Sequence, residues 1–319
     1  DGDLYKPQGE GSDLLWRGND ISKYIGIGYK SNKNTDHKSL LNMLDELNNG
    51  TNYEKHLNVD EVLKYFAVST VLSNKDSYQG IMQHSYYLYE ENGMFSILPG
   101  DFSMSFGGLI LGLNQEDMIN LKIDEPTMGP LEERPLLAKL LQVPEYKEKY
   151  HQHIEKLITT YLEPKVFEKE VTSLAEFIRP YVKKDPSKFY TLEEFEESFE
   201  RGLLTFVIQR VDNVSKQLSH KIPSAGDGSG IGIKRLEDQG NISAGNFEHF
   251  PPEMPEEMAD TLKSGNIPGG NNDQRSPEQP KMMSETIAII IIKYFDVISS
   301  LIMLIIMVLL SILFLKRKI

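Results

Sequence analysis

Four side chains that can do acid–base chemistry or hold a metal ion lie within one stretch of sequence, residues 74–108. They are Asp76, His84, Ser85 and Asp101. Two carboxylates with a polar pair between them suit phosphoryl transfer, in which one acid orients the attacking hydroxyl and a second acid holds Mg²⁺ against the phosphates. The alternative is that Asp76 and Asp101 only cap turns, as aspartates often do in loops.

The segments around these residues predict a β-hairpin that brings them together. Residues 86–90 and 94–98 have the composition of strands, and Asn92-Gly93 between them is a strong hairpin-turn pattern. In an antiparallel hairpin, the residue before the first strand lies near the residue after the second. The His-Ser pair is therefore expected beside residues 99–101, and the first acid on the loop leading into the hairpin.

Much of the remaining sequence up to residue 220 has the periodicity of helices. The clearest case is Asp60 to Ser73, for which Asn58 is a candidate cap with Glu61 three residues further on. One apolar stripe along it is formed by Val62, Leu63, Phe66, Ala67 and Val71. Other helices are expected at residues 35–48, 135–142, 145–161, 165–178 and 191–218. The sequence thus predicts an α+β domain over residues 1–220, mostly helical, with a short β-hairpin at the site.

The composition changes after residue 220. Residues 221–283 are dominated by Gly, Pro, Asn, Ser and acids, which predicts a flexible, disordered linker. Residues 297–315 are apolar apart from three serines, and as a helix they would span about 28 Å, close to the roughly 30 Å hydrocarbon core of a bilayer. We expect a single transmembrane helix there, preceded by a juxtamembrane segment at 284–296; a buried core helix is the alternative.

The ends of the chain and its composition narrow the class of protein further. The basic residues Lys316, Arg317 and Lys318 after the apolar run predict a cytoplasmic tail at 316–319, with the bulk of the chain extracytoplasmic. The chain opens with Asp1-Gly2-Asp3, with no signal peptide and in the middle of a pattern, so we expect an upstream part to be missing. A net charge of −13 argues against nucleic-acid binding. The absence of cysteine excludes disulfides, thiolate zinc sites and cysteine nucleophiles.

Several runs of residues, in order and with sensible gaps, resemble the CotH family of spore-coat kinases. They are residues 2–7, 60–68 (DEVLKYFAV), 76–80 (DSYQG), 84–89 (HSYYLY), 98–102 (LPGDF) and 181–186. The resemblance covers most of residues 1–220. It implies an atypical protein kinase-like fold that uses ATP and Mg²⁺ or Mn²⁺ to phosphorylate serines of protein substrates such as serine-rich coat or envelope proteins.

The resemblance also implies roles for the site residues. By position, Asp76 would match the catalytic acid, and Asp101 would match the metal-binding acid of an Asp-Phe-Gly-like turn. His84 and Ser85 are the candidate cofactor-binding residues, although a structural hydrogen-bonding role is the alternative for His84. Together with the apolar run at 297–315, the resemblance implies a single-pass membrane protein that is located in a spore envelope.

Two positions depart from the family pattern. The family usually has Asn where this chain has Ser85, and Trp where it has Gly100. A serine hydroxyl is a poorer magnesium ligand than an amide, and losing the Trp removes an apolar anchor beside the second acid. The upstream lobe with its phosphate-binding lysine is also expected to be missing, so this chain alone is expected to bind ATP poorly. The second hypothesis is therefore a non-catalytic surface module, for adhesion or envelope assembly, on a degraded kinase fold.

Overall fold

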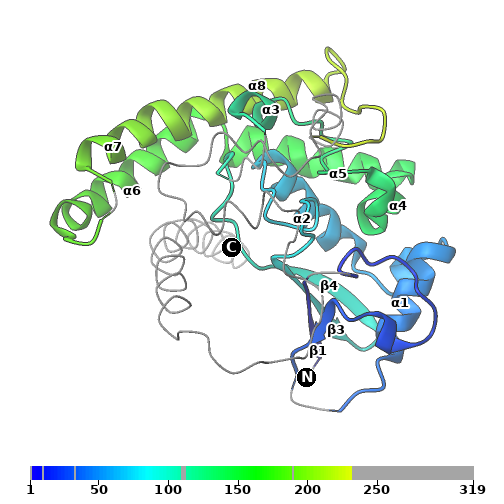
Figure 1. Ribbon diagram of the computed structural model, residues 1–319. Helices are drawn as coiled ribbons and strands as arrows, with labels where there is room; N and C mark the ends of the chain where they lie inside the picture. Colours follow the sequence, from blue (N-terminus) through cyan, green and yellow to red (C-terminus); the bar gives the residue numbers. More distant parts are fainter. Residues whose placement is uncertain (1, 9–10, 32–33, 109–112, 189, 232–319) are drawn as a thin grey trace, which may run out of the picture.

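The computed structural model describes residues 2–8, 11–31, 34–108, 113–188 and 190–231. They form a mixed α/β unit with a small sheet at one end and most of the helices at the other (Figure 1). The expected linker after Ile231, the apolar run at 297–315 and the basic tail lie outside the described residues. In the part of the chain that is described, no helix has both the length and the apolar composition needed to cross a membrane.

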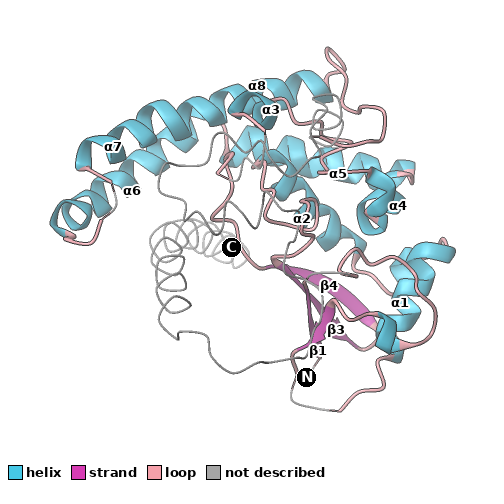
Figure 2. Cartoon of the chain, in the orientation of Figure 1, coloured by secondary structure: helices cyan, strands magenta, loops and turns pink. Residues whose placement is uncertain are grey.

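The sheet has four antiparallel strands in the order β2-β1-β3-β4, grouped together in Figure 2. They are β1 (Asp3–Pro7), β2 (Ile27–Tyr29), β3 (Tyr86–Glu91) and β4 (Met94–Pro99). The predicted hairpin is confirmed: β3 and β4 pair in register from Tyr86↔Pro99 to Glu91↔Met94. Asn92 and Gly93 have φ of 56° and 83°, the left-handed values that a type I′ turn requires. The hairpin is not alone, however, because β1 and β2 widen it into a sheet.

Eight α-helices are described. They are α1 (Lys38–Asn49), α2 (Val59–Val71), α3 (Gln115–Ile119), α4 (Pro135–Leu141), α5 (Pro144–Lys156), α6 (Pro164–Lys184), α7 (Leu192–Glu197) and α8 (Thr205–Leu218). Helix α2 lies between the sheet and helices α5 and α8 in Figure 1, and it contacts β4, α5 and α8. Its predicted apolar stripe is confirmed, since all five residues are buried. This central helix ends directly before the loop that carries the first acid.

Short helical turns complete the helical part. Three are 3₁₀ turns, at Ile21–Lys23, Tyr53–Lys55 and Leu131–Glu133. Two are π-helical segments, Leu157–Tyr161 and Ser198–Leu204, which continue α5 and join α7 to α8. The predicted helix at 191–218 is therefore confirmed, and the structure adds that residues 198–204 within it are π-helical.

The predicted cap of α2 is wrong. The Asn58 side chain makes no capping hydrogen bond. Its backbone N–H instead donates to the Phe95 carbonyl at 2.8 Å, and the Phe95 N–H donates to the His56 carbonyl at 2.8 Å. The residues entering α2 are thus fixed by a bridge to β4, a tertiary contact that sequence spacing does not reveal.

The described chain continues past Lys221, where the linker was expected to begin. Residues 223–231, here called the strap, run back along residues 123–131. The backbone N–H of Asp124 donates to the Ser224 carbonyl at 2.8 Å, and that of Ile231 donates to the Thr127 carbonyl at 2.8 Å. The Glu125 carboxylate accepts the N–H groups of Gly226 and Gly230 at 2.7 and 2.8 Å. The strap is therefore tied to the folded unit by main-chain and side-chain hydrogen bonds.

Candidate active site

The predicted juxtaposition at the open end of the hairpin is observed. Ser85 directly precedes β3 and Gly100 directly follows β4, and the Gly100 N–H donates to the Ser85 carbonyl at 2.8 Å. This bond places the His-Ser pair beside the turn that carries Asp101. Asp76 joins them from the loop after α2. The structure thus brings all four predicted residues into one region, through three different segments of the chain.

Asp76, His84 and Ser85 form a closed polar triangle. The Ser85 hydroxyl donates to Asp76 Oδ2 at 2.9 Å, and Ser85 Oγ lies 2.9 Å from His84 Nδ1. Because the hydroxyl has one proton, which goes to the carboxylate, His84 Nδ1 has to be the donor in the second contact. His84 Nε2 lies 3.2 Å from Asp76 Oδ1, a contact that becomes an ion pair when the ring is protonated.

The second acid sits in a tight local turn. Asp101 Oδ1 accepts the Ser103 N–H at 2.7 Å, which is an Asx turn. The other carboxylate oxygen, Oδ2, is buried and has no hydrogen-bond partner within the described residues. Ser103 Oγ is likewise buried and unpartnered there. The turn therefore presents oxygen atoms that protein groups leave unused.

Asn74 links the two acids, and the sequence reading did not single it out. Its Oδ1 accepts the Asp76 N–H at 3.1 Å, while its Nδ2 donates to the Asp101 carbonyl at 2.9 Å. The residue is 1 % exposed, so these bonds are shielded from water. The amide group of an Asn or Gln side chain donates from its nitrogen and accepts at its oxygen, so one side chain can bridge two groups. In the sequence, its position two residues before Asp76 was the feature that could have indicated this role.

The two departures from the family pattern contact each other. A Cβ atom at position 100 would lie 2.7 Å from the backbone C and O of Ser85, closer than such atoms approach in proteins. Ser85 itself has φ of 57°, and Gln83 has φ of 50°, both in the left-handed region. A side chain at position 100 therefore requires a different backbone at Ser85. The serine and the glycine belong to one local conformation, so the prediction that losing a Trp merely loosens Asp101 is too simple.

The surroundings of Asp76 favour the protonated form of its carboxyl group more than bulk water does. Burial raises the pKa of Asp76 above its ordinary value of 3.8. The charge of His84 and the hydrogen bond from Ser85 act in the opposite direction, and the charge of Asp101 raises the pKa again. A cation bound between two carboxylates that repel each other in this way would stabilise their charged forms.

The oxygen atoms at the site fit a hard cation such as Mg²⁺. Asp76 Oδ1 and Asp101 Oδ2 are both buried and without a hydrogen-bond partner in the described structure. Mg²⁺ binds through one or two carboxylates and fills its remaining positions with water and substrate phosphates. Among the described residues no three His, Asp or Glu side chains are grouped as a ready metal cage, so water and phosphate oxygens would have to complete the coordination.

The loop that carries Asp76 is positioned by a buried arginine on α8. Arg210 is 1 % exposed, and its guanidinium donates to the carbonyls of Thr70 and Val71 at the end of α2 at 3.0 and 3.3 Å. It also donates to the carbonyls of Ile119 and Leu121 at 2.8 and 2.7 Å. A cation at a helix C-terminus is favourable because the helix dipole is negative there. Nothing in the local sequence at residue 210 indicated this role.

Lys75, next to the first acid, points away from any phosphate position. Its Nζ donates to the Pro126 carbonyl at 2.8 Å, and the residue is 2 % exposed. Burial lowers the pKa of Lys75 well below its ordinary value, and the charge of Arg210 lowers it further. This lysine therefore joins the Asp76 loop to the 123–131 segment, and it is not a substitute for a phosphate-binding lysine.

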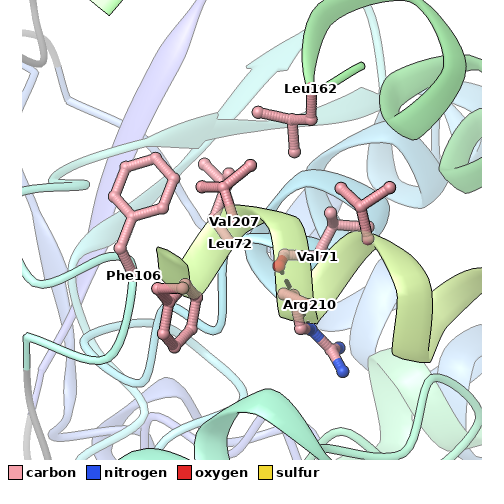
Figure 3. A pocket seen from close by; sticks show the side chains of 8 residues that line it. Val71, Leu72, Phe106, Leu162, Val207 and Arg210 are labelled. Atoms are coloured by element: carbon pink, nitrogen blue, oxygen red, sulfur yellow. Dashed lines mark hydrogen bonds between the residues drawn. The ribbon is translucent and has the colours of Figure 1, made fainter. Parts of the chain in front are cut away.

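A pocket in the neighbourhood has a structural role. It is lined by Val71, Leu72, Phe106, Leu162, Phe206, Val207, Arg210 and Val211. Figure 3 shows aliphatic and aromatic side chains around it, with the Arg210 guanidinium as the polar group. None of the four site residues lines this pocket. It is a packing gap behind the end of α2 and the Asp101 turn, and it does not coincide with the carboxylates.

Comparisons with known proteins agree with the residue pattern. Residues 1–214 match the family model described as CotH kinase protein. The inner spore coat protein H of Bacillus subtilis (strain 168) is 28 % identical over 145 residues. That alignment covers 44 % of this chain and 36 % of the relative, so the chain matches about a third of that protein's length.

Proposed function

The chain belongs to the CotH family, and we propose that it is a protein kinase-like phosphotransferase that moves phosphate from ATP to serine hydroxyls of coat or envelope proteins. The observation that carries the proposal is the convergence of Asp76 and Asp101, each with a buried carboxylate oxygen that accepts no hydrogen bond in the described structure; Asp76 Oδ1 has the His84 ring 3.2 Å away, and Asp101 Oδ2 is unpartnered. Phosphoryl transfer relies on positioning and charge stabilisation, and in this proposal these two acids would supply both.

Each acid has a distinct role in this proposal. Asp76 accepts a hydrogen bond from a hydroxyl, as the Ser85 contact illustrates at 2.9 Å, and would orient the substrate hydroxyl in the same way. Asp101 would hold Mg²⁺ or Mn²⁺ through Oδ2, since its Oδ1 is already occupied by the Ser103 N–H. The metal would neutralise charge on the phosphates when bound. Asn74 would keep the two acids at a fixed separation.

Exposed apolar side chains beside the site would suit contact with a protein substrate. Ile81 and Met82, on the loop between Asp76 and the hairpin, are 50 % and 47 % exposed. Adjacent exposed apolar side chains of this kind suit contact with an extended peptide. The similarity to inner spore coat protein H of Bacillus subtilis supports a spore-envelope location. The apolar run at 297–315 supports a membrane anchor there. Flotation of the full chain with lipid vesicles, with and without residues 297–319, tests the anchor.

The test of the activity uses the full-length gene product with labelled ATP, Mg²⁺ or Mn²⁺, and a serine-rich basic protein, because residues 1–319 alone are expected to bind ATP poorly. Transfer of label is expected with the unaltered chain and is expected to disappear in Asp76→Ala and Asp101→Ala. Asp212→Ala removes an acid on α8 whose side chain is 61 % exposed and which pairs with Lys216, and it should transfer as the unaltered chain does. Binding of a fluorescent ATP analogue with and without metal is measured in parallel.

A second candidate function has a specific observation in its favour. The Ser85 hydroxyl already occupies Asp76 Oδ2, and its left-handed backbone keeps it there. A site blocked in this way suits a non-catalytic assembly or adhesion module on a kinase-derived fold. Absence of label transfer together with absence of metal-dependent ATP binding would exclude the first function and leave the second as the better account.

A further inference from the structure

Ser85 is a hydroxyl in the position that a phosphoryl acceptor needs. A general base must lie within about 2.6–3.2 Å of the hydroxyl oxygen from which it takes a proton. The Ser85 Oγ donates to Asp76 Oδ2 at 2.9 Å, inside this range. The same Oγ contacts His84 Nδ1, so its orientation is fixed from two sides. The residue proposed to orient a substrate serine therefore already binds a serine of its own chain.

The backbone around Ser85 holds this arrangement. Gln83 and Ser85 both adopt left-handed backbone angles, a conformation that residues other than glycine rarely adopt and that clusters at functional sites. The Ser85 carbonyl accepts the Gly100 N–H, one residue before Asp101. Gly100 permits this close approach because it has no Cβ. The hydroxyl is therefore held between the acid that would orient it and the turn that would hold the metal and phosphates.

Other serines near the site do not share this geometry. Ser77 Oγ donates to the Asn74 carbonyl, which cannot accept a proton as a base. Ser103 Oγ is buried and contacts no carboxylate in the described structure. Ser224 Oγ does donate to a carboxylate, that of Asp124, but this acid also accepts from His151 and Lys147 and is not part of the candidate site. Ser224 is thus a matched comparison for Ser85.

We propose that Ser85 is an internal phosphorylation site, modified by the chain's own active site when a nucleoside triphosphate with its divalent metal is bound; this rests on the proposed function. Ser85 Oγ attacks the γ-phosphorus and forms an O–P bond. The bond between the γ-phosphorus and the β,γ-bridging oxygen breaks, and the nucleoside diphosphate leaves with the electron pair. The hydroxyl proton passes to Asp76 Oδ2.

The modification would be self-limiting. The phosphate adds about −1.5 to −2 charges beside Asp76, and like charges in a partly buried site repel. The phosphorylated side chain also blocks the approach of a second hydroxyl to Asp76 Oδ2. One phosphate per chain, and a rate of transfer to other proteins that declines as the phosphorylated fraction rises, are the expected consequences. The site would therefore switch itself off after a single intramolecular turnover.

The experiment incubates the full-length gene product with ATP and Mg²⁺ or Mn²⁺ and localises phosphate by tandem mass spectrometry. Phosphate is expected on Ser85, is expected to be lost in Asp76→Asn and Ser85→Ala, and is expected to be retained in Ser224→Ala. The modified fraction should not depend on protein concentration, because the step is intramolecular. After removal of nucleotide, the modified chain should unfold at lower urea concentration than the unmodified chain. Urea unfolding of both site variants, without nucleotide, verifies that they fold.

The remaining outcomes distinguish failure of the Ser85 inference from failure of the proposed kinase function. Transfer of label to an added serine-rich protein while Ser85 stays unmodified would overturn the inference and leave the kinase proposal standing. Phosphate at Ser224 or elsewhere at the same level, or a rate per chain that rises with protein concentration, would also overturn it. No transfer to any serine and no metal-dependent ATP binding would remove both.

Discussion

Asp124 anchors the strap and the segment behind the candidate site, and replacing it with Asn tests that anchor. The side chain is 5 % exposed and is contacted by Lys147 Nζ at 2.9 Å, His151 Nε2 at 2.7 Å and Ser224 Oγ at 2.6 Å. Burial alone would raise the pKa of Asp124, but the hydrogen bonds from His151, Lys147 and Ser224 outweigh it. They hold the pKa at about 2, below the ordinary 3.8.

The magnitude follows from linkage between protonation and folding. A carboxylate with a pKa of about 2 when folded and 3.8 when unfolded stabilises the folded state by about 2 kcal/mol at neutral pH, at about 1.4 kcal/mol per unit. Because the folded pKa is the lower one, this stability is present above pH 3.8 and is lost as the pH falls towards 2. Asp124→Asn should therefore cost about 2 kcal/mol at pH 7 and about half of that at pH 3.

Urea unfolding followed by circular dichroism at pH 7 and pH 3 measures both values. Asp60→Asn is the matched control, since Asp60 also pairs with a histidine and a lysine, His153 and Lys64, but its side chain is 45 % exposed. Solvent screening should make that substitution nearly neutral at both pH values. Equal destabilisation by Asp124→Asn at pH 7 and pH 3, or a cost no larger than that of Asp60→Asn, would refute the reasoning.

Three further predictions concern the site and its support. Gly100→Ala should lower the free energy of unfolding by roughly 1–3 kcal/mol, because the new Cβ meets the Ser85 backbone at 2.7 Å, whereas Gly202→Ala, with open space around its Cβ, should not destabilise; urea midpoints compare them. Arg210→Met should cost roughly 3 kcal/mol or more in the same assay, because buried carbonyls lose their donors. The rate of phosphate transfer should fall on acidification at a pH above 3.8, since burial raises the pKa of Asp76 and its carboxylate form is required.

Each of these three predictions would be contradicted by a specific result. Unchanged stability of Gly100→Ala would mean that the Ser85 backbone moves freely, contrary to its hydrogen bond with the Gly100 N–H. A cost below 1 kcal/mol for Arg210→Met would show that water or other groups readily satisfy the carbonyls at the end of α2. A transfer rate independent of pH between 4 and 7, with substrate and metal saturating, would exclude Asp76 as the group whose ionisation controls the reaction.

Local rules accounted for the elements that carry the site. Asn92-Gly93 determines the hairpin because its two residues accept left-handed angles that match the twist of the strands. The spacing of Val62, Phe66 and their neighbours determines which face of α2 is buried. Antiparallel pairing then places Ser85 beside Gly100 without further information. These features depend on residues close in sequence, so the sequence by itself determines them.

Tertiary structure decided how the site is held, because the decisive contacts join distant residues. Arg210 reaches carbonyls at the end of α2 about 140 residues earlier in the chain, and a buried guanidinium has to find such partners wherever the fold offers them. The entry into α2 is held by the backbone bond from the Asn58 N–H to the Phe95 carbonyl, and the Asn58 side chain makes no capping bond. The sequence determined which acids come together. Only the packing of α8, the strap and β4 around them decided that Asn74 bridges the acids and that Ser85 already occupies Asp76.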